Sequence, residues 1–95
     1  MIRTRVRFYA TFREIVGGRE VELELPDGAR VRELLDVLFA RWPTLREYLV
    51  APDGGFSKRA NLFLDGRAIR FLPDGVETPI GATQEIDCFP AVAGG

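Results

Sequence analysis

Apolar and polar residues alternate at the start of the chain. From residue 2 to residue 10 the even positions are apolar or small, whereas the odd positions are three arginines and a tyrosine. A period of two predicts a β-strand with one face toward a hydrophobic core. The same alternation returns over residues 20–25, with glutamates at the even positions, and predicts a second strand. Residues 11–19, which include a glycine pair, are expected to form the connecting loop.

The charged faces of these two strands are complementary. If the strands pair antiparallel, three arginines and three glutamates share the solvent face, namely Arg3, Arg5, Arg7, Glu20, Glu22 and Glu24. Opposite charges across a strand pair contribute roughly 0.2–1 kcal/mol each. We favour this cross-strand ion ladder over the alternative, in which the arginines form a patch for nucleic acid or a protein partner.

A helical pattern follows a Pro-Asp-Gly turn at residues 26–28. Apolar residues recur at helical spacing from Val31 to Trp42, and Pro43 is expected to end the helix. Core packing is favoured over a cofactor role for Phe39 and Trp42. The sequence Thr44-Leu45-Arg46-Glu47 has the form of a capping box and predicts a short second helix through Leu49.

The second half of the chain predicts three more strands. Residues 60–64 read as a strand, the Asp65-Gly66 turn is a strong hairpin signal, and a short strand follows at 67–69. Residues 51–59 are expected to be a loop, and residues 71–82 mostly irregular. The final strand, 85–91, has Ile86 and Cys88 on one face and Asp87 and Phe89 on the other.

This order of elements predicts an α+β fold in a single domain spanning residues 1–95. A right-handed crossover would lay the helix across one face of a mixed sheet of four to five strands. That architecture, with one crossover helix and a short second helix, is the ubiquitin-like β-grasp. Residues 90–95 are expected to form a flexible C-terminal tail.

The composition excludes several kinds of chemistry. The 95 residues include no histidine and one cysteine, so His-based catalysis, zinc sites and internal disulfides are excluded. The net charge of −1 gives no electrostatic case for binding nucleic acid or an anionic membrane. The single cysteine and the absence of a signal-peptide pattern indicate a cytoplasmic location. The chain is expected to bind no metal or cofactor and not to be an enzyme on its own.

The C-terminus carries the strongest functional signal. The chain ends in Gly94-Gly95 after an apolar run that begins at Phe89. A slim tail without side chains fits into the narrow active site of another enzyme, because glycine lets a foreign backbone or ligand approach closely. The terminal carboxylate can then be activated there. A frayed tail without function is the plain alternative.

Three segments together resemble the MoaD/ThiS family of sulfur carriers. They are the opening Val6-Arg7-Phe8-Tyr9-Ala10-Thr11-Phe12-Arg13-Glu14, the turn Asp65-Gly66-Arg67 and the ending Asp87-Cys88-Phe89-Pro90-Ala91-Val92-Ala93-Gly94-Gly95. The ending is similar to the family's Phe-Pro-Pro-Val-x-Gly-Gly. The resemblance implies that an E1-like adenylating enzyme uses ATP and magnesium to adenylate the terminal glycine. A sulfur donor then converts it to a thiocarboxylate.

The resemblance also implies roles for individual residues. Gly95 would bear the adenylate and then the sulfur, while Gly94 would let the tail pass through a narrow channel. The expected partner-binding residues are Phe89, Pro90, Val92 and Arg13. Phe89 is expected on the outward face, as an exposed anchor. Cys88 is interpreted as a small buried hydrophobe rather than a sulfur relay.

Four functions remain open on the sequence alone. The first is the small subunit of molybdopterin synthase, whose tail inserts into the large catalytic subunit. The second is a carrier for another sulfur-accepting enzyme, in cysteine biosynthesis, thiamine biosynthesis or tRNA thiolation. The third is a ubiquitin-like modifier joined to target lysines, for which Lys58 is the one lysine available for self-linked chains. The fourth is a β-grasp interaction module whose tail has no function.

Overall fold

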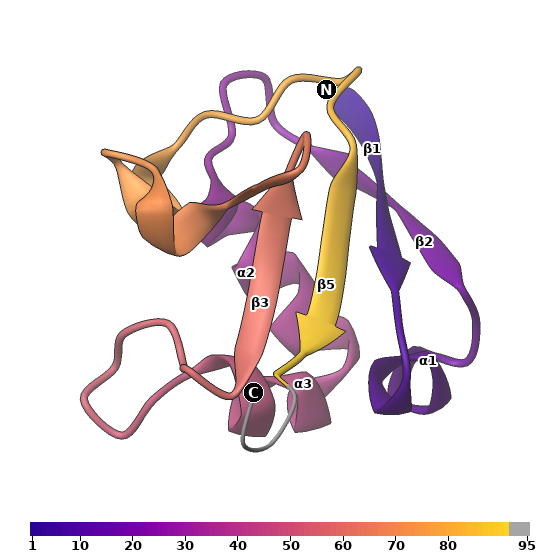
Figure 1. Cartoon of the computed structure of the whole chain (residues 1–95). Helices are drawn as coiled ribbons and strands as arrows, with labels where there is room; N and C mark the ends of the chain where they lie inside the picture. Colours follow the sequence, from indigo (N-terminus) through magenta and orange to yellow (C-terminus); the bar gives the residue numbers. More distant parts are fainter. Residues whose placement is uncertain (92–95) are drawn as a thin grey trace.

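The computed structural model describes residues 1–91. One five-stranded sheet is packed against helices on one face (Figure 1). In chain order the elements are β1 (Ile2–Phe8), α1 (Thr11–Val16), β2 (Glu20–Leu25), α2 (Val31–Arg41), α3 (Pro43–Leu49), β3 (Ala60–Leu64), β4 (Arg67–Ala68), the 3₁₀ turns η1 (Ile69–Phe71) and η2 (Gly75–Glu77), and β5 (Ile86–Pro90).

The sheet has the mixed topology expected of a β-grasp. Its strand order is β2-β1-β5-β3-β4, so the last strand of the chain lies in the middle. β1 pairs antiparallel with β2 and parallel with β5, and β3 pairs antiparallel with both β5 and β4. Because β1 and β5 are parallel, both end at the same edge of the sheet (Figure 1).

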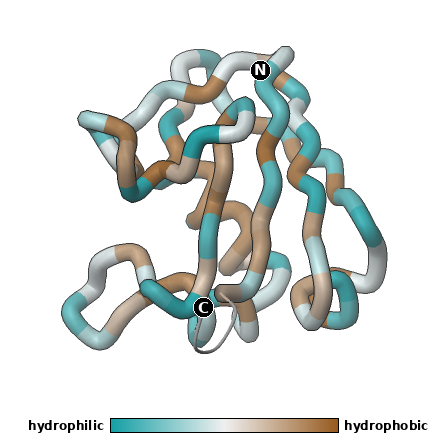
Figure 2. The backbone as a smooth tube through the Cα atoms, viewed as in Figure 1, coloured by the Kyte–Doolittle hydropathy of each residue, from teal (hydrophilic) through white to brown (hydrophobic). Residues whose placement is uncertain are grey.

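The core lies between the sheet and the helices, as the alternating pattern predicts. Teal and brown alternate along the strands in Figure 2, and the inward residues of β1 and β2 are buried except for Ile2 and Val21, which are partly buried. From α2 the same core receives Val31, Leu34, Leu35 and Leu38. Burial of these side chains removes apolar surface from water, and each Å² removed stabilises the fold by about 25 cal/mol.

The segment after β1 is a helix and not the expected loop. α1 is held by Phe12, which is fully buried and lies edge-on to the Tyr48 ring at 5.6 Å between centroids. Gly17 ends the helix in the left-handed region at φ 80°, where its N–H donates to the Arg13 carbonyl at 2.8 Å. A six-residue helix is too short to show periodicity, so its burial signal was missed.

The two later helices agree with the prediction except at one boundary. α2 ends at Arg41, and α3 begins at Pro43 with no side-chain cap from Thr44, so the capping-box interpretation was wrong. Proline suits this first position because its missing N–H has no helical partner there. Phe39 and Trp42 are partly buried against the core, which favours the packing role over a cofactor role.

The second half of the chain departs from the prediction in one place. The hairpin turn is confirmed, with Asp65 at φ 50° and Gly66 at φ 82°. However, β4 is only two residues long, because Ile69 begins the turn η1 instead of ending the strand. Residues 71–82 are mostly irregular, as predicted, and include the short turn η2. Among the described residues, no helix has the length and apolar character needed to cross a bilayer.

Candidate functional site

The site is the edge of the sheet where β1 and β5 end, because the C-terminal tail leaves from there. Pro90 is the last residue of β5 and pairs with Ala60 of β3. Beyond it, the Ala91 N–H donates to the Arg59 carbonyl at 2.8 Å, so the base of the tail is bonded to the chain that leads into β3. Val92, Gly94 and Gly95 lie outside the described residues, and their predicted roles stay predictions.

Phe89 lies on the face of the sheet opposite the helices, as predicted, but it is not a freely exposed anchor. Its ring stacks on Tyr9 with 4.2 Å between centroids and 12° between planes. A second aromatic, Phe63 of β3, approaches the same ring edge-on at 5.4 Å. Phe89 is therefore partly buried within an aromatic cluster formed by Tyr9, Phe63 and Phe89, and its orientation is fixed by its neighbours.

A buried carboxylate holds this cluster in place. Asp87 accepts hydrogen bonds from Arg7 Nε at 2.7 Å, Arg7 Nη2 at 3.1 Å and the Tyr9 hydroxyl at 2.8 Å. The parallel register places Arg7 directly beside Asp87. These hydrogen bonds to the carboxylate raise the pKa of Arg7 and the pKa of Tyr9. This role of Asp87 could not be predicted from local sequence patterns, because the contact depends on pairing between β1 and β5.

Arg13 joins the same cluster from α1 rather than from a loop. Its Nε donates to the Phe8 carbonyl at 2.8 Å, and its guanidinium lies 5.2 Å from the centroid of the Tyr9 ring. A cation over an aromatic face is attracted by the ring quadrupole. The structure thus brings Arg13, Phe89 and Pro90 to one edge of the sheet, with Tyr9 between Arg13 and Phe89.

The charged face of β1 and β2 forms the predicted ion ladder for two of the three arginines, whereas Arg7 pairs with Asp87 and Glu85. Arg3 Nη2 lies 3.4 Å from Glu24 Oε1, and Arg5 Nε lies 3.7 Å from Glu22 Oε1. These side chains are mostly exposed, so each pair contributes little to stability. Arg3 and Arg5 are matched by carboxylates of β2, and Arg7 is matched by Asp87 and Glu85, which argues against a nucleic-acid patch.

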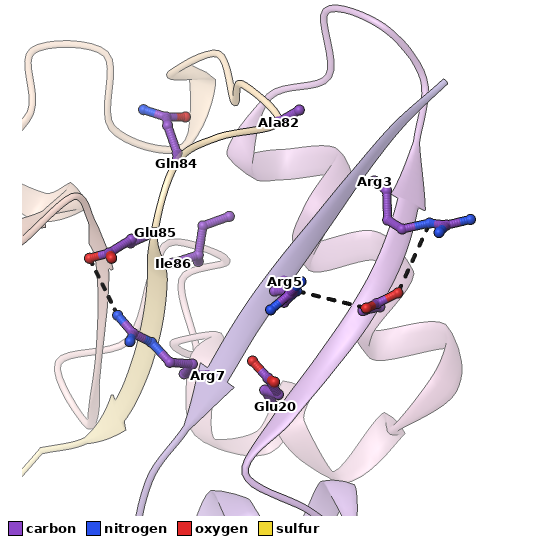
Figure 3. Close-up of a pocket in the computed structure, with 9 residues that line it drawn as sticks. Arg3, Arg5, Arg7, Glu20, Ala82, Gln84, Glu85 and Ile86 are labelled. Carbon is purple, nitrogen blue, oxygen red and sulfur yellow. Dashed lines mark hydrogen bonds and ion pairs between the residues drawn. The ribbon is translucent and has the colours of Figure 1, made fainter.

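A hollow of about 410 Å³ lies beside this ladder (Figure 3). It exists because pairing between β1 and β5 begins only at Val6 and Ile86, so the first half of β1 has no strand on that side. Arg3, Arg5 and Glu85 line it. Its lining consists mainly of charged side chains already engaged in ion pairs, and it lies toward the start of β5, away from the tail.

Cys88 is a structural residue. Its side chain is fully buried, and burial raises the pKa of the Cys88 thiol to about 12. A thiol must ionise to act as a nucleophile, so this environment suppresses a sulfur-relay reaction. Within residues 1–91, no group of three or more His, Cys, Asp or Glu side chains is placed to hold a metal ion.

Comparison with known proteins assigns the family. The model of the ThiS family matches residues 6–95. The chain belongs to the ThiS family. Small archaeal modifier protein 3 of Haloferax volcanii is 36% identical over 90 residues, which cover 95% of this chain and 96% of that protein.

Two solved structures extend the comparison. The crystal structure of small archaeal modifier protein 1 from Haloferax volcanii matches with a TM-score of 0.80 and 26% identity, covering 98% of this chain and 99% of that one. A putative molybdopterin converting factor, subunit 1, from Pyrococcus furiosus matches with a TM-score of 0.77 and 26% identity, covering 97% and 100%. This ThiS-family chain is therefore a ubiquitin-like protein of the carrier or modifier type.

Proposed function

We propose that this ThiS-family protein is a sulfur carrier whose Gly95 carboxylate is adenylated by an E1-like enzyme and converted to a thiocarboxylate. A carboxylate is a poor electrophile, and adenylation gives it a good leaving group. ATP and magnesium belong to the activating enzyme. The observation that carries the proposal is the placement of the tail base. Pro90 pairs with Ala60 of β3 and the Ala91 N–H donates to the Arg59 carbonyl, with two residues between Ala91 and the terminal Gly94-Gly95.

The activating and accepting enzymes would read the edge of the sheet beside the tail. Phe89 presents the aromatic cluster there, and Arg13 adds a positive charge beside it. Aromatic residues and arginine are the side chains that most often dominate binding at interfaces. Pro90 and Val92 follow Phe89 in the sequence, and we assign them to the same partner contact.

The sulfur acceptor we propose is the large subunit of molybdopterin synthase, with this chain as the small subunit. The structural likeness to the Pyrococcus furiosus molybdopterin converting factor subunit supports this assignment. In that reaction class two thiocarboxylates supply the sulfurs of the dithiolene. Carriers for cysteine, thiamine or tRNA thiolation use the same tail chemistry with a different acceptor.

A second candidate function is conjugation to other proteins. It is favoured by the 36% identity to a protein named as a small archaeal modifier. Here the same acyl adenylate is attacked by a lysine amine of a target, and an isopeptide bond replaces the thiocarboxylate. Both functions share the activation step and differ in the nucleophile that follows it.

Intact-protein mass spectrometry tests these functions in turn. The chain is incubated with its E1-like enzyme, ATP, magnesium and a sulfur donor, and the C-terminal peptide is sequenced. An oxygen-to-sulfur mass shift on Gly95, absent from a variant lacking Gly95, is the expected result. A tail that is never adenylated would refute the carrier and modifier functions together.

The pathway is tested with the thiocarboxylated product. Mixed with the molybdopterin synthase large subunit and its precursor, it is expected to yield molybdopterin. A thiocarboxylate that forms but does not support this reaction would exclude the molybdopterin assignment and leave the carrier function standing. Isopeptide-linked conjugates of the chain in cells, lost when Gly95 is deleted, would instead favour the modifier.

A further inference from the structure

The backbone of Arg59 anchors the residue that follows β5. Arg59 directly precedes β3, and its carbonyl accepts the Ala91 N–H at 2.8 Å. This hydrogen bond lies one residue beyond the pairing of Ala60 with Pro90. Because proline has no N–H, the N–H of Ala91 is the next backbone donor after that of Phe89. The direction in which the chain leaves β5 therefore depends on where the Arg59 carbonyl is held.

The backbone of Arg59 is itself tied to α3. Ser57 is buried, and its N–H donates to the Leu49 carbonyl at 2.8 Å. The Ser57 hydroxyl accepts a hydrogen bond from the Arg59 N–H at 3.0 Å. Leu49 is the last residue of α3, where backbone carbonyls have no N–H partner within the helix. Ser57 thus connects the end of α3 to the residue that binds Ala91.

The side chain of Arg59 returns to the same helix. Its guanidinium carbon lies 5.1 Å from the centroid of the Tyr48 ring, and its Nη1 donates a long hydrogen bond of 3.5 Å to the Glu47 carbonyl. A cation is attracted by an aromatic face and by the negative C-terminal end of a helix. The Tyr48 ring in turn packs edge-on against the buried Phe12 of α1. In Figure 1, α3 lies at the edge of the sheet where β3 begins and β5 ends.

The two neighbours of Pro90 are consequently held from different elements. Phe89 is held by the ring of Tyr9, and Ala91 is held by Arg59. A segment that already has its bound conformation loses less conformational entropy on binding. An enzyme that receives the chain beyond β5 therefore benefits from order at Ala91 as well as from the aromatic cluster.

We propose that Arg59 is a positioning residue for activation of this chain. Its side chain rests on α3, keeps the Arg59 carbonyl where Ala91 binds it, and so fixes the direction in which the chain leaves β5. This inference rests on the proposed adenylation by an E1-like enzyme. Arg59 acts through Ala91 and not by touching the enzyme. Without the side chain, Ala91 is held less firmly and the enzyme must order it during binding.

Hydrogen exchange measured by NMR tests the structural step without any enzyme. In Arg59→Gln the Ala91 amide is expected to exchange about fivefold faster, because its acceptor has lost the contacts that hold it. The Tyr9 amide is an internal reference, since it donates to the Cys88 carbonyl at 3.2 Å on the other side of β5. Its exchange should stay unchanged.

Adenylation kinetics test the functional step. In pyrophosphate exchange, Arg59→Gln should raise the KM for this chain about fivefold with little change in kcat, because order at Ala91 is lost before binding. Arg59→Lys keeps a cation beside the Tyr48 ring and the end of α3. This variant should restore most of the Ala91 protection and most of the KM.

Arg41→Gln is the matched control. Arg41 makes the same two kinds of contact as Arg59, with its guanidinium carbon 4.4 Å from the Trp42 ring centroid and its Nη1 3.4 Å from the Glu22 carbonyl. Those contacts lie beside β2, at the edge of the sheet. Arg41→Gln should lower the melting temperature about as much as Arg59→Gln, yet leave both the Ala91 exchange rate and the KM unchanged.

Three results would overturn the inference: unchanged Ala91 exchange in Arg59→Gln, faster exchange with an unchanged KM, or the same rise in KM in Arg41→Gln. A raised KM with unchanged Ala91 exchange would mean that Arg59 contacts the enzyme directly. If Ala91 loses protection as expected but even the unaltered chain is never adenylated, the proposed function fails and the structural role of Arg59 stands.

Discussion

The ring of Tyr9 lies parallel to the ring of Phe89, 4.2 Å away, while the Tyr9 hydroxyl donates to Asp87 at 2.8 Å. Tyr9 directly follows β1, whereas Phe89 and Asp87 belong to β5. One side chain from the start of the sequence thus fixes the aromatic residue that precedes the tail. The partner surface we propose is a preformed cluster and not a single projecting ring.

Substitution of Phe89 is expected to weaken activation of the tail. Phe89→Ala removes the central ring of the cluster, so the KM for this chain in the adenylation reaction should rise about tenfold, with a smaller change in kcat. Steady-state pyrophosphate exchange measures both. Phe39→Ala is the matched control, since Phe39 is also partly buried but lies on α2, behind the sheet. Equal KM values in the two variants would contradict a role for Phe89 in partner binding.

The Tyr9–Asp87 hydrogen bond makes stability sensitive to alkaline pH. The hydrogen bond to Asp87, followed by burial, raises the pKa of Tyr9 in the folded chain. A raised pKa means that the protonated phenol stabilises the fold below the unfolded value of about 10, and that this contribution is lost as pH rises through the folded pKa.

Tyr9→Phe should therefore lower the free energy of unfolding by about 1 kcal/mol at neutral pH. In this variant the free energy of unfolding should also fall less steeply as the pH rises into the alkaline range. Urea denaturation across the pH range measures both effects. An unchanged alkaline decline would show that Tyr9 is not the responsible group.

The three arginines of β1 are expected to differ in importance. Arg7 binds the buried Asp87 through two nitrogens, whereas Arg5 pairs with the exposed Glu22. Arg7→Gln leaves a buried carboxylate without its cation and should lower the melting temperature clearly, while Arg5→Gln should change it little. Calorimetry of both variants compares them directly. Equal shifts would mean that Asp87 is satisfied without Arg7.

Gly17 and Gly18 are adjacent but are expected to respond differently to alanine. Gly17 has φ 80°, a left-handed conformation that costs a residue with a Cβ about 1 kcal/mol. Gly18 has no such φ, and an added Cβ would meet the Glu20 carbonyl oxygen at an ordinary 4.0 Å. Chemical denaturation should show Gly17→Ala destabilised by about 1 kcal/mol and Gly18→Ala close to the unaltered chain.

Cys88 is expected to resist thiol reagents until the chain unfolds. Full burial and a thiol pKa of about 12 leave almost no thiolate at neutral pH. Alkylation followed by mass spectrometry should therefore depend on urea concentration and follow the unfolding transition. Rapid labelling of the folded protein would reopen the sulfur-relay interpretation.

Patterns of burial made most of the fold predictable. The alternation around Val6 and the helical spacing around Leu34 each reflect which side of one element faces the core, and that information is local. The α1 helix was missed because it is short and depends on one buried ring, that of Phe12. The α1 helix is stabilised by the contact of Phe12 with Tyr48 of α3. This contact cannot be predicted from the residues of α1 alone.

The position of the candidate site was easier to predict from the sequence than the contacts between its side chains. The approximate location of Phe89 followed from strand alternation, but its stacking on Tyr9 required the register between β1 and β5. Strand alternation placed Asp87 on the outward face but did not predict its burial. The partners that bind it, Arg7 and Tyr9, lie near the other end of the sequence. Contacts between strands that are far apart in the sequence depend on the pairing of the whole sheet. The local pattern of apolar and polar residues does not predict them.

The central position of β5 has a consequence for the synthesis of the protein. β2 and β1 form one half of the sheet and β3 and β4 the other, and β5 alone joins them. Contacts between residues distant in sequence form late, so the sheet is completed only after its last strand has left the ribosome. A chain truncated before Ile86 would lack both its tail and the strand that joins its sheet. Such a chain should be degraded as an unfolded protein, so a folded molecule in the cell is one whose synthesis has passed β5.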